Sequence, residues 1–149
     1  MHVIPQLRGL EAKFRDELTV VGVHSAKFPA ERETANVREA VLRYGVAHPV
    51  VNDREFRIWQ EYACRAWPTL MFVDPHGRIV GRHEGELPVR ELDELLGRMV
   101  REYRASGLLD PKPLPLRLES TLEAPSPLLF PGKVLADPVR RRIFIADSN

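Results

Sequence analysis

Residues 67–83 read WPTLMFVDPHGRIVGRH, and this stretch decides the fold. Residues 69–74 (TLMFVD) and 78–83 (RIVGRH) are short runs rich in apolar and β-branched residues, as expected of strands. Residues 75–77 (PHG) separate them, and proline and glycine favour a tight turn. The stretch therefore predicts an antiparallel hairpin that is opened by a Trp-Pro pair.

The segment after this hairpin has the clearest helical signal in the chain. Its apolar residues recur at intervals of three and four, which places them on one face of a helix. Pro88 precedes them and Gly107 follows them, as expected at the start and the end of a helix. The predicted face consists of Val89, Leu92, Leu96, Met99 and Tyr103.

Helices and strands alternate before the hairpin. Residues 3–14 carry an apolar stripe at helical spacing. Residues 18–25 (LTVVGVHS) are apolar at nearly consecutive positions, which is typical of a strand buried on both faces of a parallel sheet. Residues 33–44 again show helical spacing, with Gly45 as a left-handed cap, and a short extended run at 48–51 (HPVV) follows.

One more helix is predicted directly before the Trp-Pro pair. It carries Phe56, Trp59 and Ala63. Either Asn52 or Asp53 can cap it, because both side chains accept hydrogen bonds from the free N–H groups of a helix N-terminus. The expected order is thus helix, strand, helix, short strand, helix, hairpin and terminal helix.

The C-terminal part has a different character. Residues 108–131 contain six prolines, which are unfavourable in a helix or a central strand, so an extended linker is expected. Residues 133–137 (KVLAD) and 142–147 (RIFIAD) predict a second hairpin. Because a lone hairpin is marginally stable in water, it should pack on the main domain or belong to a larger β-structure.

Length, charge and cysteine content limit the function classes. A chain of 149 residues accommodates one compact domain with an appendage. The 22 basic and 21 acidic residues give a net charge of +1, so no field attracts nucleic acid or an anionic membrane. Neither a membrane-spanning run nor a signal peptide is evident. Cys64 is the one cysteine, which favours a reducing compartment, and we expect a cytoplasmic protein.

The order of elements, with Trp67-Pro68-Thr69 opening the hairpin, resembles the thioredoxin superfamily and its redoxin branch. Four further segments resemble the family of NHL repeat-containing protein 2 and its bacterial relatives, in which a thioredoxin-like domain precedes an NHL β-propeller. These segments are GVHSAKF (22–28), AVLRYG (40–45), HPVVND (48–53) and SPLLFPGK (126–133). The resemblance implies an α/β, three-layer fold with a mixed sheet.

The resemblance also implies boundaries. It divides the chain into an incomplete thioredoxin-like domain (1–107), a proline-rich linker (108–131) and the start of an NHL-type β-propeller (132–149). The family pattern places a strand and a Cys-x-x-Cys pair directly before Met1, so we expect a chain that is truncated at both ends. Without that N-terminal strand, two apolar strands would have unpaired edges. We therefore expect poor stability in isolation and a tendency towards a strand-exchanged homodimer.

The resemblance implies a contact surface for protein thiols or peptide segments. Pro68 matches the cis-proline that faces the dithiol in this superfamily, and Trp67, Pro68 and Thr69 are the expected substrate-binding residues. From its residue type alone, Trp67 could equally belong to the core. No catalytic residue is expected in this chain, because dithiol exchange needs an activated thiolate and a second thiol.

Other candidate residues have two readings each. Cys64 is either a lone redox thiol or, as is commoner, a small buried hydrophobic residue. His24, Ser25, Lys27 and Phe28 follow the buried strand at its C-terminal end, where α/β folds often bind ligands, but they could simply form a turn.

Several chemistries are disfavoured. The five histidines lack the spacing of a metal site, so neither metal nor cofactor is expected. The run Arg140–Arg142 lacks interleaved aromatic residues and indicates a solvated tip rather than a nucleic-acid site. Phosphate-cradling glycine loops and nucleophile elbows are missing from the sequence.

Two hypotheses about function remain. In the first, the chain belongs to a thiol-disulfide oxidoreductase or redoxin-type protein fused to NHL repeats, lacks the Cys-x-x-Cys pair and is inactive alone. In the second, it is a non-catalytic scaffold for protein interaction. The fold cannot separate the two, because function depends on the site.

Overall fold

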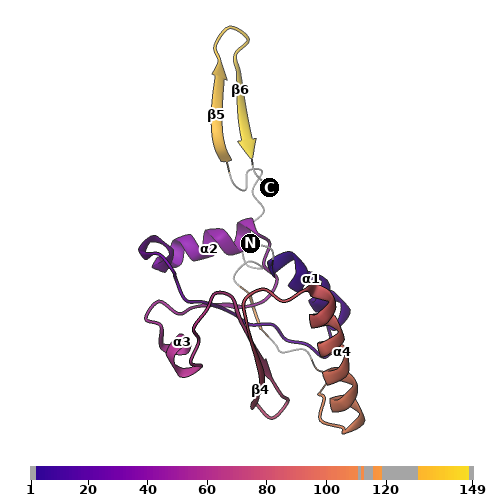
Figure 1. The fold of residues 1–149 in the computed structure, drawn as a ribbon. Helices are drawn as coiled ribbons and strands as arrows, with labels where there is room; N and C mark the ends of the chain where they lie inside the picture. The colour runs from indigo at the N-terminus through magenta and orange to yellow at the C-terminus, as the bar shows by residue number, and fades with distance from the viewer. Residues whose placement is uncertain (1–2, 111, 113–115, 119–130, 148–149) are drawn as a thin grey trace.

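Helices and strands alternate along most of the chain in the computed structural model, which describes residues 3–110, 112, 116–118 and 131–147 (Figure 1). The elements are α1 (Val3–Lys13), β1 (Gly22–His24), the 3-10 helix η1 (Pro29–Arg32), α2 (Thr34–Arg43), β2 (Val50–Asn52), α3 (Arg57–Glu61), β3 (Thr69–Val73), β4 (Ile79–Glu84), α4 (Val89–Ala105), β5 (Pro131–Asp137) and β6 (Arg142–Asp147).

The predicted antiparallel hairpin is confirmed as β3 and β4, in which Leu70 pairs with His83. Its turn depends on Asp74, whose carboxylate accepts hydrogen bonds from the N–H groups of His76 and Arg78 at 2.9 and 2.8 Å. Gly77 has a φ of 80°, a left-handed conformation that glycine adopts without steric cost.

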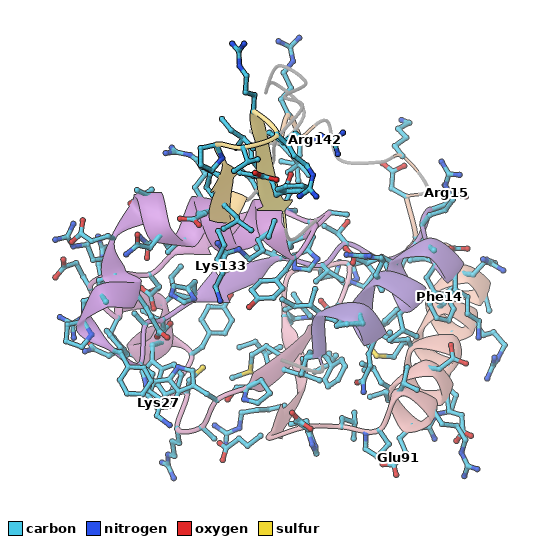
Figure 2. All side chains as sticks on the ribbon, turned by 90° about the horizontal axis from the view of Figure 1, so that it is seen from above. Phe14, Arg15, Lys27, Glu91, Lys133 and Arg142 are labelled. Atoms are coloured by element: carbon cyan, nitrogen blue, oxygen red, sulfur yellow. The ribbon has the colours of Figure 1, made fainter. Side chains whose placement is uncertain are left out.

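The core lies where α1 and α4 pack side by side (Figure 1). Leu10 and Phe14 meet Leu92 and Leu96 there, and Phe72 packs against them from β3. Figure 2 shows Phe14 directed at α4. On the predicted face of α4, Leu92 and Leu96 are buried, whereas Val89 at the helix start is 44% exposed. Helix α4 ends as expected, with Gly107 at a φ of 70°.

The first strand is shorter than its apolar run predicts. The expected strand covers residues 18–25, but β1 comprises only Gly22–His24, paired in parallel with Val50–Asn52. A strand extends as far as its hydrogen-bond partner, and β2 offers partners for these three residues only. Leu18 packs against the core instead of forming a ladder.

The strands form three two-stranded sheets: β1 with β2, β3 with β4, and β5 with β6. In the described ranges, no strand pairs with both β1 and β3, so each has one edge without a strand partner. Both strand directions of the predicted mixed sheet are present, because β1 and β2 pair in parallel and β3 and β4 pair antiparallel. Apolar residues next to these edges are accessible: Val23 is 44% and Val73 47% exposed.

The C-terminal hairpin of β5 and β6 stands apart from the helices and the other strands (Figure 1). Val134 pairs with Ile145 and Leu135 with Phe144. Arg142 begins β6, so the arginine run spans the tip and the start of this strand. Most of the predicted linker, including residues 113–115 and 119–130, lies outside the described residues.

Candidate functional site

The candidate site is the loop that leads into β3. The Trp67–Pro68 peptide bond is cis. The indole N–H of Trp67 donates a 2.8 Å hydrogen bond to the backbone carbonyl of Ser25, just beyond β1. This bond ties the carboxyl end of β1 to the amino end of β3. Trp67 nevertheless remains 49% exposed.

Trp59 of α3 covers one face of the Trp67 ring. The ring centroids lie 4.2 Å apart with 26° between the planes, which is a stacked arrangement. Phe56 meets Trp59 edge-on, at 6.0 Å and 72°. Trp67 is therefore both packed and accessible: its ring stacks on Trp59, while about half of the residue remains exposed.

Asp53 organises the support beneath this aromatic pair. Its carboxylate, in a residue only 5% exposed, accepts hydrogen bonds from the N–H groups of Ile58 and Trp59 at 3.1 and 2.9 Å. It also accepts a 2.8 Å bond from the Ser25 hydroxyl. Of the two capping candidates, the aspartate therefore caps α3, whereas the Asn52 side-chain amide donates to the carbonyl of Arg32.

Helix α3 is shorter than predicted. It ends at Glu61, and Ala63, expected inside the helix, has a left-handed φ of 49°. Phe56 also lies outside, with a φ of 56° at the helix start. The apolar spacing of residues 56–63 therefore does not form one continuous helical face, and Ala63 is exposed.

The Pro68 carbonyl and the Thr69 hydroxyl both have hydrogen-bond partners within the chain. The Pro68 carbonyl accepts a 2.8 Å bond from the N–H of Gly85, and the Thr69 hydroxyl donates to the Ala66 carbonyl at 2.7 Å. Of the three expected substrate-binding residues, Trp67 is thus the exposed one, while the other two are half-buried.

The four candidate residues at the carboxyl end of β1, His24, Ser25, Lys27 and Phe28, separate into two pairs. Ser25 is buried, and the ring Nε2 of His24 lies 3.0 Å from the Glu31 carbonyl. Lys27 and Phe28 are exposed, with the ammonium 5.8 Å from the ring centroid. Figure 2 shows Lys27 at the periphery. The structure thus joins Ser25 to the Trp67 loop and directs Lys27 outwards.

Cys64 is half-buried next to this loop, and its backbone N–H donates to the Trp59 carbonyl at 2.9 Å. Burial raises the pKa of its thiol, the positive charge of Arg82 opposes this effect, and the charge of Glu84 adds to it. The thiol is therefore largely protonated at neutral pH, which makes it a weak nucleophile. This environment matches the structural reading of Cys64.

The chain carries two buried aspartates with a lowered pKa. Burial alone raises the pKa of Asp53, but hydrogen bonds from Trp59, Ser25 and the other donors more than offset it. The pKa of Asp74 is lowered chiefly by the N–H of Arg78. A depressed folded-state pKa stabilises the fold above the unfolded-state value, and that stabilisation disappears as the pH falls through the folded-state value.

We expect stability to fall below about pH 4, where these two carboxylates begin to take up protons in the unfolded chain but remain ionised in the folded one. The measurement is the urea midpoint at pH 7, 5 and 3. The double variant Asp53→Asn/Asp74→Asn should start lower at pH 7 and lose less between pH 5 and 3. Equal acid sensitivity in both proteins would exclude these two groups as the cause.

A hollow of about 1000 Å³ lies elsewhere, between α4 and β4. Its apolar floor includes Phe14 and Phe72. Lys13 and Asp93, which also line the hollow, form an ion pair at 2.6 Å, so their charges are already paired within the chain. The residues that line this hollow do not include Trp67, Pro68 or Thr69.

Within the ranges that the structure covers, no group of three His, Cys, Asp or Glu side chains is placed to hold a metal. In the same ranges, no helix is both long and apolar enough to cross a membrane.

Comparison of the sequence with known proteins identifies relatives of this chain. The family model described as thioredoxin-like domain matches residues 6–99. The whole chain is 44% identical to Protein SUPPRESSOR OF QUENCHING 1, chloroplastic, of Arabidopsis thaliana and 39% identical to NHL repeat-containing protein 2 of Homo sapiens. It spans only 14% and 21% of their lengths. Over 62% of the chain, it is 26% identical to Thiol-disulfide oxidoreductase ResA of Halalkalibacterium halodurans, covering 51% of that protein.

Proposed function

Since the chain belongs to the thioredoxin-like domain family, we propose that it is the thioredoxin-like domain of a thiol-disulfide oxidoreductase or redoxin-type protein fused to NHL repeats. In this proposal, Trp67, Pro68 and Thr69 form the surface that meets protein thiols or extended peptide segments. The chain itself binds such segments and does not exchange disulfides.

The observation that carries this proposal is the state of Trp67. An exposed aromatic ring on a surface normally has rotational freedom, but this ring is held by a stacked partner and by a hydrogen bond while 49% of the residue stays accessible. A rigid, accessible tryptophan offers a large contact area at a low entropic cost. Such residues dominate protein interfaces energetically.

The cysteine content supports binding without exchange. Dithiol exchange proceeds through a thiolate that attacks a disulfide and a second thiol that resolves the mixed disulfide. The 149 residues contain one cysteine, and the pKa of its thiol is raised. The printed name of one relative, Thiol-disulfide oxidoreductase ResA, mentions thiol-disulfide chemistry, and that chemistry would need cysteines in addition to Cys64.

The C-terminal hairpin supports the link to a propeller. The cross-strand pair Val134–Ile145 lies on one face and Leu135–Phe144 on the other, and all four residues are at least 41% exposed. A hairpin that is apolar on both faces requires cover on both sides, as strands have in stacked β-sheets. We therefore propose 1–107, 108–131 and 132–149 as domain, linker and first part of an NHL-type β-propeller.

The alternative is a non-catalytic scaffold that positions a propeller for partner proteins. The presence of a single cysteine supports this alternative as much as it supports the first proposal. A reducing compartment such as the cytoplasm fits both proposals, although the printed name of the Arabidopsis relative marks that protein as chloroplastic.

An insulin reduction assay separates the two candidates. We expect the 149-residue chain to leave the rate of insulin reduction by dithiothreitol unchanged. A variant extended before Met1 by an apolar strand and a Cys-x-x-Cys pair should accelerate it. If the extended variant folds but is equally inactive, the oxidoreductase proposal fails and the scaffold proposal stands.

Strand exchange between two copies is a further proposal about partners. It rests on the edges of β1 and β3 that lack strand partners in the described ranges and on the accessible Val23 beside them. Light scattering should detect a species of twice 17.0 kDa that increases with concentration. Val23→Lys should lower that fraction, because charge at a strand edge opposes pairing. A monomer at every concentration would contradict the proposal.

A further inference from the structure

Four residues form a closed ring of contacts around the Trp67 loop. Asp53 accepts from the Ser25 hydroxyl and from the Trp59 N–H, Trp59 stacks on Trp67, and the Trp67 indole donates back to the Ser25 carbonyl. The members come from the ends of β1 and β2, from α3 and from the loop before β3. One carboxylate therefore touches two of the supports that hold the exposed indole.

We infer that Asp53 is a positioning residue that fixes the orientation of Trp67 for ligand binding. It acts through two routes, since Ser25 presents the carbonyl that holds the indole N–H and Trp59 presents the ring that stacks on it. Only one consequence of this inference rests on the proposed function, namely that ligand binding weakens when the Trp67 ring moves freely.

Two features favour this role over that of an ordinary helix cap. Helix α3 has only five residues, so its own hydrogen bonds cannot hold the Trp59 ring in place. The backbone of the same region is also anchored to β1, because the Asp53 N–H donates to the His24 carbonyl at 3.0 Å. Asp53 thus links the helix, β1 and the loop at one point.

The negative charge of Asp53 strengthens the hydrogen bonds that its carboxylate accepts. A carboxylate that accepts hydrogen bonds makes stronger ones than a neutral amide, and Asp53 is buried where water competes little. Asp53→Asn keeps the shape of the side chain, loses the charge and places an amide donor against existing donors. The substitution should therefore release Ser25 or the first turn of α3.

The test measures hydrogen exchange of the Trp67 indole N–H by NMR, without any ligand. The chain has two tryptophans, and Trp59→Phe removes one indole signal and so identifies the other. We expect the Trp67 indole to exchange at least about 10-fold faster in Asp53→Asn, because the substitution weakens the hydrogen bonds to Ser25 and Trp59, the two residues that hold the indole. Backbone amides of Leu92 and Leu96 report general loss of stability.

Asp74→Asn is the matched control, because Asp74 is equally buried (7% exposed), has a lowered pKa and holds a turn in the same way. It should leave indole exchange unchanged relative to the core amides. If Asp53→Asn accelerates the core amides and the indole equally, or leaves both unchanged, the inference is wrong. Should Asp53→Asn fail to fold, Ser25→Ala takes its place with the same expected direction, and unchanged indole exchange there would also overturn it.

The consequence for binding is measured separately with S-carboxymethylated insulin B chain, which has neither a free thiol nor a tryptophan. Asp53→Asn should bind it more weakly than Asp74→Asn does. If the indole exchanges faster but even the unaltered chain does not bind this polypeptide, the proposed function fails while the positioning role stands.

Discussion

Replacing Trp67 by alanine is expected to weaken binding of S-carboxymethylated insulin B chain at least about 30-fold. A central interface tryptophan commonly contributes about 2 kcal/mol or more, and 1.4 kcal/mol corresponds to a factor of ten. The ring carries the accessible area of this loop, because the polar groups of Pro68 and Thr69 already have partners. Titration calorimetry provides the measurement.

The control for this prediction is Phe144→Ala on the C-terminal hairpin. Phe144 is 52% exposed, which matches Trp67, but it lies on β6. Its removal should leave the affinity within about twofold, since a change outside the contact removes little binding energy. If both variants lose affinity equally, the polypeptide binds exposed aromatic rings without selectivity. If neither does, the Trp67 loop is not the binding surface.

Replacing Leu96 by alanine is expected to destabilise the domain by about 2–5 kcal/mol, the range for truncating a buried leucine. Leu96 is 8% exposed and packs with Leu10, Phe14 and Leu92 between α1 and α4. Small domains are stable by only about 5–15 kcal/mol, so this one change removes a large share of the total. The measurement is urea unfolding followed by far-UV circular dichroism.

Val89→Ala on the same helix is the matched control. Val89 begins α4 and is 44% exposed, so its truncation creates no cavity. We expect a change within about 0.5 kcal/mol, because alanine also has the higher helix propensity. Similar losses in both variants would mean that the α1–α4 contact is not the main source of stability.

The sequence predicts the elements whose signal is local. The hairpin of β3 and β4 follows from two apolar runs and a Pro-His-Gly turn, and α4 follows from regular spacing between Pro88 and Gly107. These signals depend only on residues that are close in the sequence, and the elements that they predict agree with those in the folded chain.

Elements that depend on distant partners are predicted less well. The length of β1 is set by β2, some 28 residues further on, so the apolar run 18–25 overstates it. Helix α3 ends at Glu61, before the left-handed Ala63, and the contact of Trp59 with Trp67 is one that no helical periodicity encodes. The apolar pattern locates these elements along the chain but gives neither the partner that ends each element nor the burial of every residue, since Val23 is 44% exposed.

The candidate site is predictable in part. The Trp67-Pro68-Thr69 motif identifies the loop, whereas the role of Asp53 is visible in the sequence only as one of two possible caps. The joint action of Asp53 and Ser25 requires the carboxyl ends of β1 and β2 to lie side by side. A serine directly after one short strand and an aspartate directly after its parallel neighbour are the signal that could have indicated it.

The most direct test of the central claim is a ¹⁵N chemical-shift titration of the 149-residue chain with S-carboxymethylated insulin B chain. The account predicts that the largest changes fall on the Trp67 indole N–H and on the backbone of Thr69 and Ser25, with the α1–α4 core unaffected. Shifts confined to the C-terminal hairpin or to the hollow beside α4, with the Trp67 indole unchanged at saturation, would contradict it.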